Sequence, residues 1–323
     1  MSIIFSPASI GNLRLNNRIV LPPMQQYQGS AEGFATAYHA LHYARRARGG
    51  VGLVIVESTA VAPEGRLMAD DVGLFSEAHV APLAAVAAAV KAEGVPILVQ
   101  LSHGGRKSRP HGGGRLLAPS AIAYDADYGL PAAMGLDEVA VAGAAFAQAA
   151  ARALAAGFDG VELHAAHGYL LHQFLSPLSN RREDGYGGSA ANRLRFLAEV
   201  IQAVRAVVGP DRPVTMRVSA SDHAEGGLEA EMVATALREL VPLGLDAVHV
   251  SSGGLLPMPP RETGPGYQIR YAEIIRAAID VPVIAVGNIR SRQQVEDILT
   301  KGAADLVAIG RPLLIYPDLA RIL

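Results

Sequence analysis

The chain has 323 residues, of which 50% are hydrophobic and 18% are charged, and its formal net charge is −2. This composition can form a large core, and it excludes an intrinsically disordered chain. No cluster of Lys or Arg offers an electrostatic footprint for nucleic acid or an anionic membrane, so we expect neither partner. The absence of Cys excludes disulfides, thiolate catalysis and Cys-ligated metals, and it is consistent with a cytoplasmic, reducing compartment.

Short β-branched runs, each bounded by Gly, Pro or polar residues, recur along the whole chain. Eight such strands are predicted, at 18–21, 51–56, 97–101, 160–163, 214–218, 247–250, 283–286 and 306–309. Helical periodicity lies between them, at 38–48, 80–93, 140–156, 192–208, 229–240, 271–278 and 292–300. The alternation predicts an α/β protein with a parallel sheet, and eight units indicate a single-domain (β/α)8 TIM barrel over residues 1–323.

A doubly wound sheet is the alternative fold, but the GxGxxG motif that is typical of it does not occur. The main departure from a minimal barrel is the stretch 104–136, which is rich in Gly, Pro and Tyr and follows the third predicted strand. Loops of this length in compact domains are usually functional, so we expect a lid or capping insertion.

Function in a barrel lies where the strands end, and two of these ends suggest a phosphate site. Gly287 and Asn288 follow the seventh predicted strand, and Gly310 and Arg311 follow the eighth. Loops at these two positions often bind phosphate through backbone N–H groups. Tight turns without a ligand are the alternative interpretation of these glycines.

The fourth predicted strand is followed by His164, His167 and Tyr169. Two imidazoles three residues apart can donate hydrogen bonds to a carbonyl or nitro oxygen, while a phenol that is protonated at neutral pH can supply a proton. His-x-x-His can also chelate a metal, although no third ligand is obvious in the sequence. A structural role inside the core is the third interpretation.

Arg217 lies within the apolar fifth run, where a buried cation requires an anion or an acceptor-rich ring. Gln100, at the third strand, can donate and accept hydrogen bonds at a pyrimidine-like edge, which favours the ring. A structural ion pair of Arg217 with Glu57, Glu162 or Asp246 is the alternative.

Several segments resemble the Old Yellow Enzyme family, in particular its bacterial thermophilic-like subgroup. They are RIVLPPM at 18–24, HAAHGYLLHQFLSPLSNRR at 164–182, YGGS at 186–189, EGG at 225–227, VGN at 286–288 and IGRPLL at 309–314. The resemblance spans essentially the whole chain. It implies an FMN-dependent ene-reductase that carries hydride from NADPH or NADH, through the flavin, to the β-carbon of an α,β-unsaturated carbonyl or nitro compound.

The resemblance also implies roles for individual residues. Pro22, Pro23, Met24 and Ala60 would line the flavin ring, with Gln25 where the subgroup usually has Cys; Gln100 would meet the pyrimidine edge, Arg217 would face N1 and O2, and Gly287, Asn288, Gly310 and Arg311 would hold the phosphate. His164 and His167 would anchor the substrate oxygen, Tyr169 would protonate the α-carbon, and Tyr27 would close the pocket.

The resemblance further implies a homo-oligomer, a dimer or a tetramer. Two alternative functions stay open. One is a flavin-binding sensor or carrier with little turnover, and the other is a metal-dependent barrel lyase. We expect no metal, because no third ligand accompanies the histidine pair.

Overall fold

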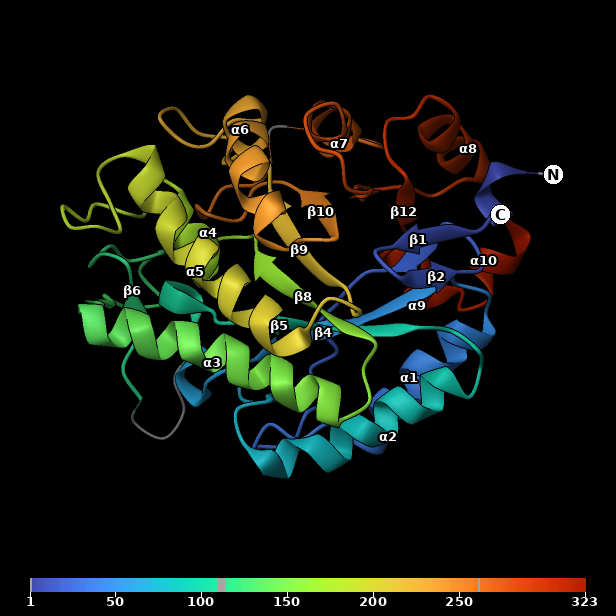
Figure 1. The fold of residues 1–323 in the computed structure, drawn as a ribbon, viewed down its shortest axis with the longest axis horizontal. Helices are drawn as coiled ribbons and strands as arrows, with labels where there is room; N and C mark the ends of the chain where they lie inside the picture. Colours follow the sequence, from blue (N-terminus) through green and yellow to red (C-terminus); the bar gives the residue numbers. More distant parts are fainter. Residues whose placement is uncertain (1, 110–113, 261) are drawn as a thin grey trace.

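Eight parallel strands close into a barrel in the computed structural model, which describes residues 2–109, 114–260 and 262–323 (Figure 1). In barrel order the strands are β3 (Ile19–Leu21), β4 (Leu53–Ala60), β5 (Ile97–Ser102), β8 (Gly160–Ala165), β9 (Val214–Ser219), β10 (Ala247–Ser251), β11 (Val283–Ala285) and β12 (Leu306–Ala308), and β12 pairs with β3. Each predicted run overlaps one of these strands, so the (β/α)8 barrel is confirmed and the doubly wound alternative is wrong.

The helices surround the barrel (Figure 1). They are α1 (Ala37–Arg48), α2 (Val80–Lys91), α3 (Leu136–Ala155), α4 (Leu170–Leu175), α5 (Ala190–Val208), α6 (Ala230–Leu240), α7 (Ile269–Arg276), α8 (Arg292–Thr300), α9 (Arg311–Ile315) and α10 (Leu319–Ile322). The sequence predicts seven of them but not the short α4, α9 and α10. Local signals set the ends of α5, because Ser189 Oγ accepts the Asn192 N–H at 3.1 Å and Gly209 ends the helix with φ +74°.

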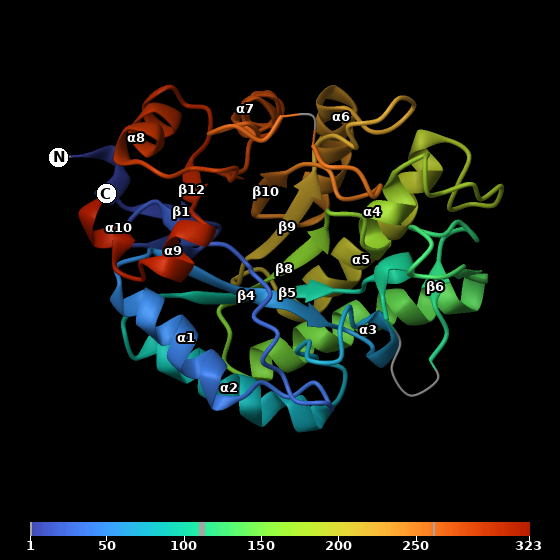
Figure 2. The same ribbon diagram turned by 180° about the vertical axis from the view of Figure 1, so that it is seen from behind.

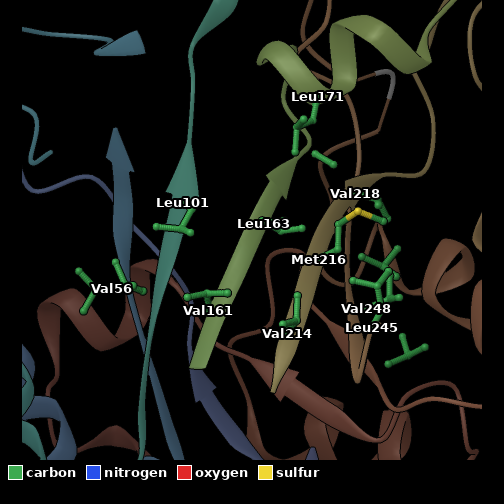
Figure 3. Packing of buried hydrophobic residues seen from close by; sticks show 14 of the residues in the cluster. Val56, Leu101, Val161, Leu163, Leu171, Val214, Met216, Val218, Leu245 and Val248 are labelled. Carbon is green, nitrogen blue, oxygen red and sulfur yellow. The ribbon is translucent and has the colours of Figure 1, made fainter. Parts of the chain in front are cut away.

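The main core lies between the barrel and the helices, and alternate strand residues contribute to it. Figure 3 shows Val161 and Leu163 of β8 beside Met216 and Val218 of β9, and all four are buried. The residues between them along the strands therefore point into the barrel. The strands thus carry their functional side chains on the inner face.

The barrel interior changes from apolar to polar along the strand direction. Its lower part is an apolar cluster that includes Leu53, Leu98 and Leu306, each near the start of its strand. Ile10 and Leu15 join this cluster from an antiparallel hairpin, β1 (Ala8–Ile10) and β2 (Leu13–Leu15), which the sequence pattern does not predict. The hairpin therefore closes the amino-terminal end of the barrel and leaves the carboxyl ends of the strands for the site.

The stretch 104–136 leaves the barrel after β5 and returns at α3. Its described part contains the 3-10 helix η4 (Gly105–Lys107) and a parallel pair, β6 (Leu117–Ala118) and β7 (Ala132–Ala133), on the side of the barrel that carries α3 and α4 (Figure 2). Residues 110–113 of the predicted lid lie outside the described residues. Its role as a lid stays a prediction.

Four further 3-10 helices connect the elements: η1 (Ile3–Phe5), η2 (Pro63–Gly65), η3 (Glu77–His79) and η5 (Val241–Leu243). Within the described ranges, no helix is both long enough and apolar enough to cross a membrane.

Candidate active site

A cavity of about 1170 Å³ opens at the carboxyl ends of the strands. Pockets for small ligands are typically about 300–1,000 Å³, so this cavity can hold a ligand of several rings. Nine of the predicted site residues line it: Pro22, Pro23, Met24, His167, Arg217, Gly287, Asn288, Gly310 and Arg311. The other six, Gln25, Tyr27, Ala60, Gln100, His164 and Tyr169, lie beside or below its walls.

One end of the cavity is a glycine-rich cradle. A Cβ at Gly287, where φ is +135°, would lie 2.9 Å from Gln268 Cβ, and a Cβ at Gly310 would lie 3.3 Å from Met24 Sδ. Both positions therefore bring bare backbone to the cavity wall, which suits a phosphate. Asn288 is held in a left-handed conformation, with φ +53°, and its side chain donates to Thr263 O at 2.9 Å.

The two predicted histidines lie together on β8 and the loop after it. Their facing nitrogens, His164 Nε2 and His167 Nδ1, are 3.4 Å apart, and His167 Nε2 is 2.7 Å from Ser251 Oγ. Because the Ala166 N–H donates to His164 Nδ1 at 3.3 Å, the proton of a neutral His164 is on Nε2 and faces His167. One chain of hydrogen bonds therefore orients both rings.

Both imidazoles are held neutral. Burial lowers the pKa of His164 and of His167 well below the usual range, and the nearby Arg217 and Lys107 cations lower both further. Neutral imidazoles each keep one N–H donor. Here these donors face His167 Nδ1 and Ser251 Oγ, and a carbonyl or nitro oxygen would accept them in place of these partners.

Tyr169 lies against this pair, with its ring centroid 4.6 Å from that of His164. Burial raises the pKa of the Tyr169 phenol, and the negative charge of Asp71 and the Tyr27 phenol raise it further. Tyr27 is therefore close enough to Tyr169 to influence its ionisation. The raised pKa keeps the phenol of Tyr169 protonated at neutral pH.

Arg217 is buried and points toward the cavity without a carboxylate partner among the described residues. It pairs in register with His164 on one side and His249 on the other, and its Nη2 donates only a long bond, 3.5 Å, to Ser251 Oγ. Its Nε has no hydrogen-bond partner in the described part of the chain. The predicted alternative, a structural ion pair, is not formed, because Glu57, Glu162 and Asp246 pair with His39, His249 and Arg205.

This orphaned guanidinium is the observation that tests whether FMN fits. A buried cation with unused donors requires an anion or an acceptor-rich ring in the adjacent space. The cavity that Arg217 lines is also lined by the bare backbone of Gly287 and Gly310, where a phosphate tail could bind. The residues present therefore fit the flavin nucleotide.

Gln100 lies deeper in the barrel, at 1% exposure. Its Nε2 donates to Glu162 Oε1 at 2.8 Å, and the second carboxylate oxygen of Glu162 accepts from His249 Nδ1 at 3.0 Å. One N–H of the Gln100 amide is engaged by Glu162, which leaves its carbonyl oxygen and its second N–H for other partners. The sequence alone did not indicate that Glu162 orients Gln100.

The loop after β3 carries Pro22 to Tyr27, and two carboxylates hold it. Gln25 Nε2 donates to Asp71, and the Gln26 N–H donates to Glu57 Oε2 at 2.7 Å. Tyr27 adopts φ +55° and is 53% exposed, so it lies at the rim. Ala60, at the end of β4, is buried.

Sequence reasoning missed three residues of the site. Gln268 lines the cavity and is 3% exposed, but it precedes α7 and follows no strand directly. Ser251 directly follows the sixth predicted run, 247–250, and it bonds His167 and Arg217. Lys107 lies within the long stretch 104–136, and its contact with the loop after β8 has no signal in the sequence.

A metal centre finds no ligand set in the part of the chain that the structure describes. No group of three or more His, Asp or Glu side chains there is arranged to hold an ion. The third ligand that the sequence could not supply for His164 and His167 is thus not supplied by the fold of these residues.

Comparison with known proteins agrees with this site. A model of the NADH:flavin oxidoreductase / NADH oxidase family matches residues 3–323. The chain is 44% identical to an NADPH dehydrogenase of Bacillus subtilis over 98% of this chain and 93% of that protein. Among solved structures, a 2-naphthoyl-CoA reductase complex gives a TM-score of 0.94 at 26% identity, covering 99% of this chain and 51% of that one. A morphinone reductase gives 0.84 at 31% identity, covering 99% and 90%.

The family model matches almost the whole chain, so the barrel and the site at its carboxyl end both belong to the matched region. FMN is the cofactor of the family, and NADPH or NADH is its reductant. The chain belongs to the NADH:flavin oxidoreductase / NADH oxidase family, the Old Yellow Enzyme family of FMN-dependent oxidoreductases.

Proposed function

We propose that this oxidoreductase is an ene-reductase that reduces the C=C bond of α,β-unsaturated carbonyl or nitro compounds. The observation that carries the proposal is the convergence of two neutral imidazoles and a protonated phenol beside the orphaned Arg217 guanidinium. Bound FMN would take hydride from NADPH or NADH and pass it to the β-carbon of the alkene. The chain would orient the alkene, polarise its C=C bond and supply the proton for the α-carbon.

Residues from six of the barrel strands and the loops after them would hold the cofactor. Arg217 would meet the acceptor edge of the ring, where a fixed cation stabilises developing negative charge. Gln100 would offer its free carbonyl to a ring N–H. The other proposed contacts are Pro22, Pro23, Met24, Gln25 and Ala60 along the ring and Gly287, Asn288, Gly310 and Arg311 at the phosphate.

His164 and His167 would bind the carbonyl or nitro oxygen of the alkene. As the β-carbon accepts hydride, negative charge develops on this oxygen, and the two N–H donors would stabilise it once they exchange His167 Nδ1 and Ser251 Oγ for the substrate oxygen. The Ala166 N–H, which donates to His164 Nδ1, keeps the His164 proton on Nε2. Tyr27, at the rim, would close the pocket over the substrate.

Tyr169 would donate the proton to the α-carbon. The phenol is protonated at neutral pH because burial raises its pKa, and its ring packs beside His164, next to the site of the bound oxygen. The Arg217 cation, which lowers the pKa of Tyr169, would stabilise the phenolate left after transfer.

Replacement of the Tyr169 phenol tests this role. Tyr169→Phe should slow alkene reduction by about 10²- to 10⁴-fold, the range for loss of a general acid. Reduction of bound FMN by NADPH needs no proton from Tyr169 and should stay near the parent rate in anaerobic stopped-flow absorbance. Tyr186→Phe, which removes a phenol that binds Glu199 away from the cavity, is the control. Equal loss in both half-reactions, or loss in neither, would contradict the proposal.

A homo-oligomer, a dimer or a tetramer, and a cytoplasmic location stay predictions. Light scattering of the purified holoenzyme measures the first. The sensor or carrier alternative predicts reduction by NADPH without reoxidation by an alkene, so the stopped-flow experiment also separates that function from an ene-reductase.

A further inference from the structure

Lys107 reaches from the end of η4 to the meeting point of two other loops. Its Nζ donates to His167 O at 2.9 Å and to Gly254 O at 3.0 Å. The ion pairs of the described residues include none to Lys107, whereas Lys91 pairs with Asp159 at 2.7 Å. Lys107 is therefore an ammonium bound by backbone carbonyls and not by a carboxylate.

Two aromatic faces complete the surroundings of this ammonium. Nζ lies 4.5 Å from the ring centroid of Tyr124 and 5.3 Å from that of Tyr169. Such contacts offset part of the cost of burying a cation. Burial nevertheless lowers the pKa of Lys107 to about 8, which means that burying the ammonium costs free energy. An uncharged side chain could fill the same space without this cost.

The two carbonyls meet because the loops touch through bare backbone. A Cβ at Gly254 would lie 2.7 Å from His167 Cα, and a Cβ at Gly168 would lie 2.4 Å from Gly254 O. His167 itself has φ +56°, a left-handed conformation that is unfavourable for a residue with a side chain. Some contact must hold His167 in this conformation, and the ammonium binds its carbonyl directly.

The amide of Gln173 fixes η4 against the same loop from below. Gln173 Nε2 donates to Gly104 O at 3.0 Å and to Gly168 O at 2.7 Å, and its Oε1 accepts the Arg106 N–H at 3.2 Å. The start of the lysine side chain is therefore fixed relative to His167. Together, Lys107 and Gln173 join the loops after β5, β8 and β10.

We propose that Lys107 is a positioning residue for the substrate anchor: its ammonium binds the His167 and Gly254 carbonyls and thereby holds the His167 ring between His164 and Ser251. The inference rests on the proposed function of the histidine pair. Lys107 acts through His167, so its loss should weaken binding at the pair while leaving the flavin site intact.

The first test compares phenol binding by holoenzyme variants. The probe is 4-hydroxybenzaldehyde, whose oxygen the histidine pair would bind, and the readout is the change in visible absorption of bound FMN. Lys107→Met keeps the length of the side chain but removes its donors, and it should weaken binding by about tenfold to a hundredfold, as loss of charged hydrogen bonds predicts. FMN content and Tm should stay near the parent values. Lys301→Met, at an exposed helix end, is the matched control.

The chain offers a charge-specific rescue because it contains no Cys. In Lys107→Cys, alkylation with 2-bromoethylamine displaces bromide from carbon by the thiolate and gives a side chain that ends in an ammonium. Alkylation with 1-bromopropane gives the uncharged side chain of equal length. Mass spectrometry reports a single alkylation in each. The aminoethyl form should recover most of the phenol affinity, and the propyl form should not.

The outcomes separate this inference from the proposed function. His164→Ala/His167→Ala serves as the reference for the loss of the anchor. If this double variant binds the phenol as the parent does, the proposed function fails and the role of Lys107 fails with it. If the double variant loses binding while Lys107→Met does not, or if both alkylated forms recover equally, only the role of Lys107 is overturned.

Discussion

Arg217 is a buried cation whose natural partner is a ligand. Its neighbours in register are histidines that are held neutral, and the three carboxylates that the sequence offers as partners, Glu57, Glu162 and Asp246, are engaged elsewhere. A buried charge without a partner destabilises a folded protein, whereas the same charge strengthens the binding of an anion. Arg217 should therefore act oppositely on the apoprotein and on its complex with FMN.

Arg217→Met should weaken FMN binding by about 1.5 to 3 kcal/mol, the usual worth of hydrogen bonds to charged groups. The apoprotein should be as stable as the parent or more stable, because the variant replaces an unpaired buried charge with an uncharged side chain of similar volume. Flavin fluorescence gives the affinity, and urea unfolding of the apoprotein gives the stability. A large loss of apoprotein stability would indicate that the guanidinium has a structural role.

The predictable site residues are those at the carboxyl end of a strand or directly after it. His164, Arg217 and Gly310 could be found in this way, because parallel strands bring their carboxyl ends to one edge. Gln268 and Lys107 could not, because each reaches the site from within a long loop. Their positions depend on contacts between loops, and the periodicity of a single sequence predicts helices and strands but not such contacts.

The β1–β2 hairpin is the element that closes the barrel opposite the site. Ile10 and Leu15 extend the apolar interior cluster, and both are at most 1% exposed. Each strand has three residues, too few for the alternation that identifies longer strands. The hairpin was missed for this reason, as was the six-residue helix α4.

Ile10→Ala should lower the free energy of unfolding by about 2–5 kcal/mol, the range for removing a buried Ile side chain. FMN affinity should not change, because the hairpin lies at the amino-terminal end of the strands. Chemical unfolding and flavin titration measure the two quantities. Ser9→Ala, on an exposed residue of the same strand, should have little effect on either. Weaker FMN binding in Ile10→Ala would show that the two ends of the barrel are coupled.

Over the whole molecule, buried histidines form the largest set of groups with lowered pKa. Burial is the first cause in each case, and it brings the pKa of His42 to about 3 and that of His103 to about 4. Among the described residues, this set includes His42, His79, His103, His164, His167 and His249. Each favours the neutral form in the folded state.

The sign of the resulting pH dependence follows from linkage. Below about pH 6.5, the unfolded chain takes up protons that the folded protein refuses, so the free energy of unfolding decreases as the pH falls from about 7 toward 5. The Tm of the holoenzyme should therefore be several degrees lower at pH 5.5 than at pH 7.5. His42→Gln should reduce this difference. A Tm that stays constant over this range would contradict the histidine assignment.

A single additional residue in β4 decides which side chains face the flavin site. The register with β5 shifts between Val56 and Ser58, so Glu57 turns outward, where its carboxylate accepts the Tyr43 O–H at 3.1 Å, and Ser58 pairs with Gln100. Without this bulge, a regular ladder of the same residues would pair Glu57 with Gln100 and turn every position from Glu57 to Ala60 to the opposite face. Engineered libraries for this enzyme should therefore keep the length of this segment constant and keep Glu57, whose carboxylate holds the loop after β3.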